Sequence, residues 1–343
     1  MALGAEVAIA RPALDLPVAA SFPRQPATWY LLCRSRDIGR DPISATAARR
    51  QVAAFRDERG RVAVLDARCC HLGANLGRGT TVDGVLRCPY HHWSYDRTGQ
   101  CVSIPGADRP PHGIRVRAYP AVERHGYVFF FNGPESDFPL PFFDNCDPAE
   151  FVASPAFRFT TDSPWFMLVG NGFDTQHFHA VHDRKLLGTT RVDCPAPFAR
   201  RMRFDAEVIG PTLFDRLLRR FVGAKVQIKI TSWGGPLVLV EGIFRRAHSR
   251  LLVASQPIDD VNTLSEVIVF ARRASALRGG RLADWVNLRI RRRFTQAFMQ
   301  DDIDRLRDVR YRPEGLTALD QDLIDYFRWA AMLPRSEYEA PAE

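Results

Sequence analysis

The sequence predicts an α+β protein, in which an antiparallel β domain is followed by a second antiparallel sheet with helices toward the C-terminus. Short apolar runs alternate with Gly, Pro and Asp from residue 29 to about residue 134, which is typical of a small sheet with tight turns. Longer alternating segments recur from residue 157 to residue 257. Beyond them, apolar residues recur every three to four positions, which indicates helices.

The first domain is predicted to span residues 27–135, after an N-terminal extension of residues 1–26. Its expected strands are residues 29–33, 51–55, 62–66, 84–88 and 127–133. The connector PESDFPLPFFDNCDPAE, residues 134–150, is rich in proline and acidic residues and marks the domain boundary.

The second domain is predicted to span residues 136–343. Its expected strands are residues 157–163, 201–208, 225–233, 236–244 and 250–257. Two helices are expected after them, over Ala283–Val309 and Leu316–Met332. A chain of 343 residues with 46% apolar and 25% charged residues is long enough for two folded domains.

The net charge of +8 does not indicate nucleic-acid binding, because the basic residues are scattered. The densest basic run, residues 289–293, lies in an expected helix and is read as a solvated face. A basic surface could equally steer an acidic electron donor. The chain has no uninterrupted apolar run near 18 residues, so we expect no membrane span. The first residues lack a basic segment and carry Glu6 and Asp15, which argues against a signal peptide.

Two short motifs each combine one cysteine with one histidine. They are Cys69-Cys70-His71 and Cys88-Pro89-Tyr90-His91. Their loops contain glycine and proline, which let a backbone wrap closely around an inorganic centre. Two Cys on one iron and two His on the other is the ligand set of a Rieske [2Fe-2S] cluster. Structural zinc is the alternative, but zinc sites usually pair Cys with Cys and His with His, so the mixed pairs favour the cluster.

On these motifs the chain resembles the Rieske domains of the Rieske non-heme iron oxygenases. Sixteen residues separate His71 from Cys88, and residues 89–93 read Pro-Tyr-His-x-Trp. The respiratory Rieske proteins carry two further cysteines where this chain has Ala74 and Tyr90, so the resemblance is to the oxygenase kind.

The resemblance implies four cluster ligands, Cys69, His71, Cys88 and His91. The neighbouring His92 stands where most members of the family have glycine, and the C-x2-H spacing selects His91 over it. The other cysteines are read as reduced, which favours a cytoplasmic protein. They are Cys33, Cys70, Cys101, Cys146 and Cys194.

A second metal site is indicated in residues 171–183, where three of the nine histidines lie beside carboxylates. Two His and one carboxylate form the facial triad of non-heme Fe(II) enzymes. The alternative is a polar helix end with solvated histidines. On an ideal helix, residues five positions apart point about 140° away from each other, so His177 and His182 need a helix end to meet. His179 is three residues from His182 and competes for the site.

The segment matches the D-x2-H-x4-H pattern of the oxygenase family. By that resemblance His177 and His182 are iron ligands, and Asp174 is the carboxylate that links an iron-bound His to a Rieske His across a subunit interface. The third ligand is expected in FMQDDIDRL, residues 298–306, where Asp302 is preferred and Asp301 stands at the position of the family's Glu. Nearby apolar residues that could line a pocket are Phe166, Met167, Leu168, Phe178 and Phe298, although plain core is the commoner role for such residues.

The resemblance covers roughly residues 29–329 and implies a helix-grip-like sheet in the second domain. It implies the terminal oxygenase component of a multicomponent monooxygenase or dioxygenase system. Such a component uses O2 and electrons from NAD(P)H, delivered by a separate reductase with or without a ferredoxin. It also implies a homotrimer and an apolar or aromatic organic substrate. Alternative functions are a Rieske electron carrier or redox sensor without a working mononuclear iron, and a zinc-stabilised binding protein.

Overall fold

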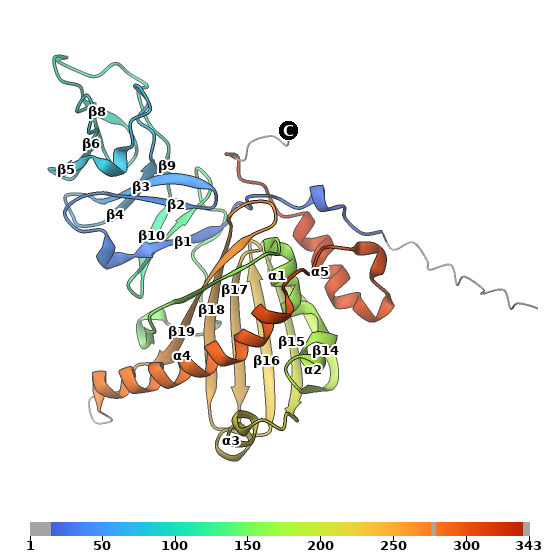
Figure 1. Cartoon of the computed structure of the whole chain (residues 1–343). Helices are drawn as coiled ribbons and strands as arrows, with labels where there is room; N and C mark the ends of the chain where they lie inside the picture. Colours follow the sequence, from blue (N-terminus) through green and yellow to red (C-terminus); the bar gives the residue numbers. More distant parts are fainter. Residues whose placement is uncertain (1–14, 276–278, 339–343) are drawn as a thin grey trace, which may run out of the picture.

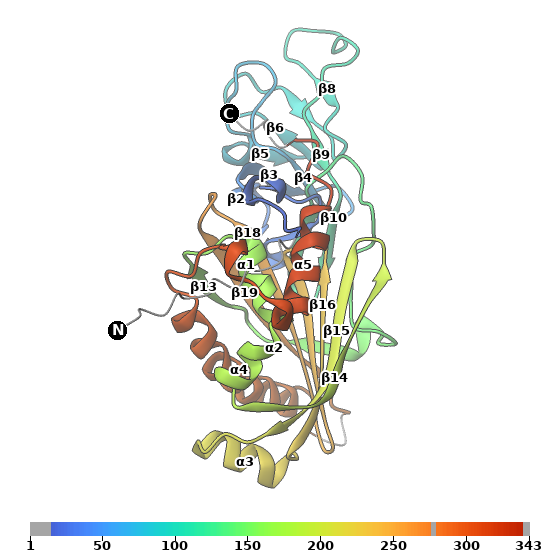
Figure 2. The same ribbon diagram turned by 90° about the vertical axis from the view of Figure 1, so that its right-hand side faces the viewer.

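A computed structural model describes residues 15–275 and 279–338, and it has the predicted α+β architecture (Figure 1). A first part, in blue and cyan, holds three small antiparallel sheets. A second part holds one large antiparallel sheet with helices along one of its faces, as the turned view in Figure 2 makes clear.

Eleven short strands build the first part, in three sheets ordered β1-β11-β10, β2-β3-β4-β9 and β5-β6-β7-β8. Their bounds are β1 Trp29–Arg34, β2 Ile43–Ala47, β3 Arg50–Arg56, β4 Val62–Asp66, β5 Thr80–Val82, β6 Val85–Arg87, β7 Ser94–Tyr95, β8 Cys101–Ser103, β9 Ala118–Tyr119, β10 Ala121–Arg124 and β11 Tyr127–Phe131.

Strand β3 joins two hydrophobic cores of this part. Its residues Val52 to Phe55 are fully buried, and because successive side chains of a strand point to opposite faces, they divide between two clusters. Val52 and Ala54 pack with β1 and β11, whereas Ala53 and Phe55 pack with Cys69, Cys88 and the β5–β8 sheet. The sheet that carries the Cys and His loops is therefore anchored to the rest of the domain through β3.

The large sheet of the second part has the order β12-β19-β18-β17-β16-β15-β14, with β13 paired beside β12 on β19. Its strands are β12 Phe151–Ala153, β13 Phe157–Thr161, β14 Arg184–Ala196, β15 Ala199–Val208, β16 Lys225–Trp233, β17 Leu237–Phe244, β18 His248–Pro257 and β19 Thr263–Arg272. The helices are α1 Trp165–Gly170, α2 Thr175–Ala180, α3 Leu213–Phe221, α4 Gly280–Arg305 and α5 Gln321–Ala331.

The two faces of this sheet have different partners. On β17, Val238 belongs to the core beneath the helices, while Leu237 and Leu239 belong to a core formed with Phe138 of the connector and Trp29 of β1. One face therefore carries the helices and the other carries the first domain and the connector. The long helix α4 crosses the helical face (Figures 1 and 2).

Both ends of the described chain pack on the domain that is remote from them in sequence. Phe22 stacks on Phe166 of α1 with ring centroids 3.7 Å apart, so residues 15–26 of the predicted extension lie on the second domain. At the other end, the Tyr338 ring packs edge-on against Tyr119 of the first domain. Residues 1–14 of that extension fall outside the described residues. No described helix is both long enough and apolar enough to span a bilayer.

Several boundaries differ from those predicted. The second C-terminal helix begins at Gln321 rather than Leu316, because Asp320 accepts hydrogen bonds from the backbone and hydroxyl of Thr317 and ends a 3-10 turn there. The strands β14 and β19 and the helix α3 are not among the predicted elements. β14 carries glycine and polar residues in place of a clear alternation.

Candidate metal centres and active site

The first Cys-His loop is a tight turn closed by its own backbone. The Cys69 N–H donates to the Ala74 carbonyl at 2.9 Å, and the Gly73 N–H donates to the Cys69 carbonyl at 2.9 Å. Gly73 has φ of +73°, a conformation that glycine adopts without strain. In the second loop the Cys88 N–H donates to the Trp93 carbonyl at 2.8 Å, and His92 sits at φ of +58°. That left-handed position explains why glycine would fit there.

The structure brings the four predicted cluster ligands together. The two thiols are buried in the domain, and the two imidazoles lie nearer its surface. Cys69 and Cys88 are 3% and 2% exposed, whereas His71 is exposed and His91 is half-buried. The rings of His71 and His91 lie 4.7 Å apart. This donor set fits a [2Fe-2S] group with a buried thiolate-bound iron and an imidazole-bound iron at the surface, where electrons can leave.

Aromatic residues hold the two imidazoles. The His71 ring stacks on Trp93 with centroids 4.4 Å apart, and the His91 ring lies against Tyr90 at 3.8 Å. His92, the alternative ligand, is exposed and has no ring contact with His71 among the described contacts. The geometry favours His91.

Tyr95 lies beneath the cluster loops and contacts the sulfur of a predicted ligand. Its hydroxyl is 3.0 Å from Cys69 Sγ and 3.3 Å from Cys70 Sγ. Burial raises the pKa of Tyr95 far above its ordinary value, so the hydroxyl keeps its proton. It can therefore donate to a thiolate, and hydrogen bonds to the sulfurs help to set the potential of such clusters.

A Tyr95→Phe protein is expected to keep its cluster but to have a lower reduction potential. Removing the donor destabilises the more negative, reduced state, by an amount on the order of tens of millivolts. Redox titration followed by electron paramagnetic resonance measures the shift. Tyr90→Phe is the matched control, because Tyr90 is 64% exposed. Equal potentials in Tyr95→Phe and the wild type would contradict the assigned hydrogen bond.

The second predicted site forms where α2 ends. Asp174 caps this helix by accepting from the Gln176 and His177 backbone N–H groups at 2.9 and 3.2 Å. The helix stops at Ala180, so the chain turns before His182 and its ring returns toward His177, at 4.8 Å and 87°. The end of the helix therefore lets two side chains five residues apart meet, which a continuous helix would prevent.

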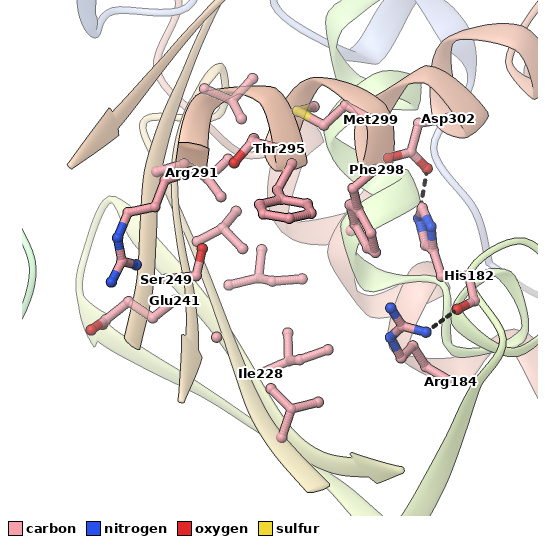
Figure 3. Close-up of a pocket in the computed structure, with 18 of the residues that line it drawn as sticks. His182, Arg184, Ile228, Glu241, Ser249, Arg291, Thr295, Phe298, Met299 and Asp302 are labelled. Atoms are coloured by element: carbon pink, nitrogen blue, oxygen red, sulfur yellow. Dashed lines mark hydrogen bonds and ion pairs between the residues drawn. The ribbon is translucent and has the colours of Figure 1, made fainter. Parts of the chain in front are cut away.

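Asp302 of α4 completes the group, as Figure 3 shows for His182 and Asp302. Its Oδ1 is 2.7 Å from His177 Nε2 and 2.9 Å from His182 Nε2, and the two Nε2 atoms are 3.1 Å apart. Adjacent ligands about 2.1 Å from an octahedral metal lie about 3.0 Å apart, so the three atoms have the separation of one face of such a metal. This arrangement fits a mononuclear Fe(II).

The electrostatics of the group suit a cation. Burial opposes ionisation of Asp302, but the hydrogen bonds from His177 and His182 outweigh it and lower the pKa of the carboxyl to about 2. The two competing candidates, His179 and Asp301, are exposed and lie outside the group. The side chains that the structure brings together are therefore those of His177, His182 and Asp302, and not those of His179 or Asp301.

Three residues that the sequence did not single out support this site. Asn171 Nδ2 lies 3.1 Å from His177 Nε2 and 3.2 Å from Asp302 Oδ1. Arg184 donates to the His182 carbonyl at 2.6 Å and to Asp215 of α3 at 2.9 Å, with both side chains buried. This ion pair ties α3 to the backbone of a ligand. The only sequence signal for this ion pair is an arginine two positions after His182.

A cavity of about 590 Å³ extends from the three ligands between the sheet and α4. Its lining is mostly apolar, and Figure 3 places His182 and Asp302 at one end and Ser249 and Arg291 at the other. Of the five predicted pocket residues, Leu168, Phe178 and Phe298 line it. Phe298 also stacks on the His182 ring at 4.0 Å. Phe166 and Met167 belong to the core instead.

Residues 28–120 match the Rieske [2Fe-2S] domain family. The structure also superimposes on dicamba monooxygenase bound to dicamba with a TM-score of 0.60 and 20% identity, covering 90% of this chain and 96% of that one. This chain has a Rieske domain and the fold of dicamba monooxygenase. The predicted resemblance and fold class are thereby confirmed.

Relatives of this Rieske-domain protein are named for several oxidations. Aminopyrrolnitrin oxygenase PrnD of Pseudomonas fluorescens is 38% identical over 169 residues, which are 46% of each protein. Cholesterol 7-desaturase nvd of Bombyx mori is 33% identical over 170 residues, 48% of this chain and 37% of the relative. The chain thus matches less than half the length of these relatives. The fold of Pseudomonas putida CBB5 NdmB is also similar, with a TM-score of 0.64 and 16% identity over 93% of this chain and 92% of that one.

Proposed function

We propose that this protein is the terminal oxygenase component of a Rieske system and oxidises an apolar or aromatic organic substrate with O2. The observation that carries the proposal is the facial triad of His177, His182 and Asp302 at one end of an apolar cavity, in a chain that also has a Rieske domain. Open positions beside two His and one carboxylate are what O2 activation requires.

In this proposal Cys69, His71, Cys88 and His91 hold the [2Fe-2S] cluster, and the triad holds Fe(II). The bound metals supply the electron relay and the site of O2 reduction. Phe298 and Asn171 keep the imidazoles and the carboxylate in place through the contacts described above. The apolar walls hold a substrate beside the triad and exclude water from it.

The electrons are proposed to come from NAD(P)H through a separate reductase, with or without a ferredoxin, in the cytoplasm. All seven cysteines are free, which suits a reducing compartment. Asp174 is proposed to link the triad of one subunit to the Rieske histidines of a neighbour, within a homotrimer. The mixture of named activities among the relatives, a desaturase and oxygenases, supports an oxidation without choosing between hydroxylation, demethylation, N-oxygenation, desaturation and cyclisation.

Metal analysis of anaerobically purified protein tests the proposal. We expect about three irons per chain, two for the cluster and one for the triad, together with the resonance signal of a histidine-ligated cluster after reduction. Two irons that stay at two after Fe(II) addition would instead favour an electron carrier or redox sensor. Zinc without iron would overturn the oxygenase proposal.

An Asp174→Asn protein is expected to keep both metal centres and to transfer electrons between them slowly. Asn still caps α2, so the fold is preserved, but the carboxylate is lost. We expect reoxidation of the reduced cluster by O2, in the presence of substrate, to slow by roughly 10- to 100-fold. This is the usual effect of losing a carboxylate that hydrogen-bonds a metal ligand. Stopped-flow absorbance measures the rate. Asp183→Asn is the control, since Asn tolerates the φ of +51° found there.

A further inference from the structure

One end of the second domain exposes an apolar surface that is framed by arginines. We define it as the mouth face: the helix α3, the turn between β17 and β18, and the first half of α4. In Figure 1, α3 and the start of α4 lie at the end of the molecule opposite the Rieske domain.

The apolar residues of the mouth face follow helical stripes. On α3, Leu213, Leu217 and Phe221 are spaced four apart and so share one side of the helix. On α4, a second stripe runs through Leu282, Trp285, Val286, Ile290 and Phe294. All eight side chains are between 42% and 70% exposed. Large apolar side chains gathered in this way mark an interaction site rather than ordinary surface.

The charges of the mouth face are all of one sign. Exposed arginines occupy α3 at Arg216 and Arg220, the turn at Arg245 and Arg246, and α4 at Arg281, Arg289 and Arg293. Within residues 15–275 and 279–338, none of the seven forms an ion pair with a carboxylate.

The acidic residues of the same segments are withdrawn from this surface. In α3 and in the part of α4 up to Phe294 they are Asp215 and Asp284, which are 5% and 6% exposed. Asp215 pairs with Arg184, and Asp284 accepts from the Ala274 N–H. The face therefore presents apolar and cationic groups without exposed acids.

The cavity opens on the mouth face. Leu217 and Phe221 of α3 and Ile290 and Phe294 of α4 line the cavity and are also exposed. A substrate that enters between these helices therefore passes directly from the apolar face to the apolar cavity.

We infer that the mouth face docks on the surface of an anionic phospholipid bilayer, from which an apolar substrate enters the cavity. Helices with exposed apolar residues beside arginines bind such interfaces through apolar insertion and attraction to anionic headgroups. A two-fold contact of this face with the same face of a second copy fits poorly, because it would set seven arginines against seven others. The substrate route rests on the proposed function, whereas the membrane contact does not.

Co-sedimentation of the full chain with vesicles tests the inference. Binding to vesicles of phosphatidylcholine alone is compared with binding to vesicles that contain about 30% phosphatidylglycerol, an anionic phospholipid. We expect binding at least about tenfold tighter to the anionic vesicles, and weakened by added salt.

Two sets of variants separate the apolar and charge contributions. The triple variant Leu213→Ser, Leu282→Ser, Trp285→Ser avoids the cavity lining, and the second set is Arg216→Gln, Arg220→Gln, Arg289→Gln. Each is expected to lower the affinity for anionic vesicles at least about tenfold. The control is Leu319→Ser, Met332→Ser, which removes two apolar residues that are 78% and 76% exposed elsewhere.

Circular dichroism and iron content establish that each variant is folded. Equal binding to both vesicle types, or binding unchanged in both sets of variants, would overturn the inference. The mass of the assembly is also measured by light scattering. If the apolar variant had a lower mass than the wild type and the wild type did not bind vesicles, the face would be a contact between copies and the inference would be overturned. Failure of the proposed function would show separately, in the iron count and turnover.

Discussion

A His177→Ala protein should retain the cluster and lose turnover. The change removes one of three proposed iron ligands, whose nitrogen and oxygen atoms lie within 3.1 Å of one another. Loss of a residue that only hydrogen-bonds a metal ligand typically lowers activity by roughly 10- to 100-fold, so loss of a ligand should lower the rate by at least about 1,000-fold. Substrate-dependent O2 consumption with a surrogate reductase measures the turnover rate. The iron content should fall from about three irons per chain to about two.

Asp302→Ala is also expected to retain the cluster, lose the third iron and lose turnover. Its matched control is Asp301→Ala, one residue away on the exposed side of α4, and His179→Ala is the control for the histidines. Both controls should keep their iron and their activity. If the Asp301 variant lost the third iron and the Asp302 variant kept it, the choice of carboxylate would be wrong.

A Cys88→Ser protein is expected to lose the [2Fe-2S] cluster entirely, with its colour and its resonance signal. Cys88 is 2% exposed and shares a core with Cys69, Leu76 and Tyr95. Since metal binding and folding are coupled, the β5–β8 sheet should also become less stable. Absorbance and iron content of the purified protein measure the first effect, and limited proteolysis of the first domain measures the second.

The Cys70→Ser variant tests whether a cysteine beside the cluster is needed without being a ligand. Cys70 is adjacent to the proposed ligand Cys69 but is exposed. The variant should bind the cluster as the wild type does. A red-brown Cys88→Ser protein with two irons would falsify the ligand assignment, whereas a colourless Cys70→Ser protein would show that this thiol matters to cluster assembly.

The cluster loops were predictable because their ligands are close in sequence. Cys69 and His71 belong to one turn, and Cys88 and His91 to another, so spacing alone limits the geometry. The structure adds the burial difference between the thiols and the imidazoles, the Tyr95 hydroxyl and the left-handed backbone at His92. These features depend on the β5–β8 sheet and on the packing beneath it.

The triad was only partly predictable. His177 and His182 are near in sequence, but their meeting depends on where α2 ends, and the choice between Asp301 and Asp302 depends on the rotation of α4 over the sheet. A helix rotates by about 100° per residue, so an assignment uncertain by one residue is uncertain about the direction of the side chain. Packing of Phe298 on His182 fixes that rotation.

Residue patterns alone were enough to predict the α+β class, the Rieske motifs and the histidine pair, because these features depend on local periodicity and short spacings. The folded chain alone reveals the position of Asp302 beside the histidines, the Asn171 and Arg184 contacts, the cavity and the mouth face. Each of these joins segments far apart along the chain, such as Asn171 and Asp302. Their relative placement follows from the packing of α3 and α4 on one face of the large sheet, which no local pattern encodes.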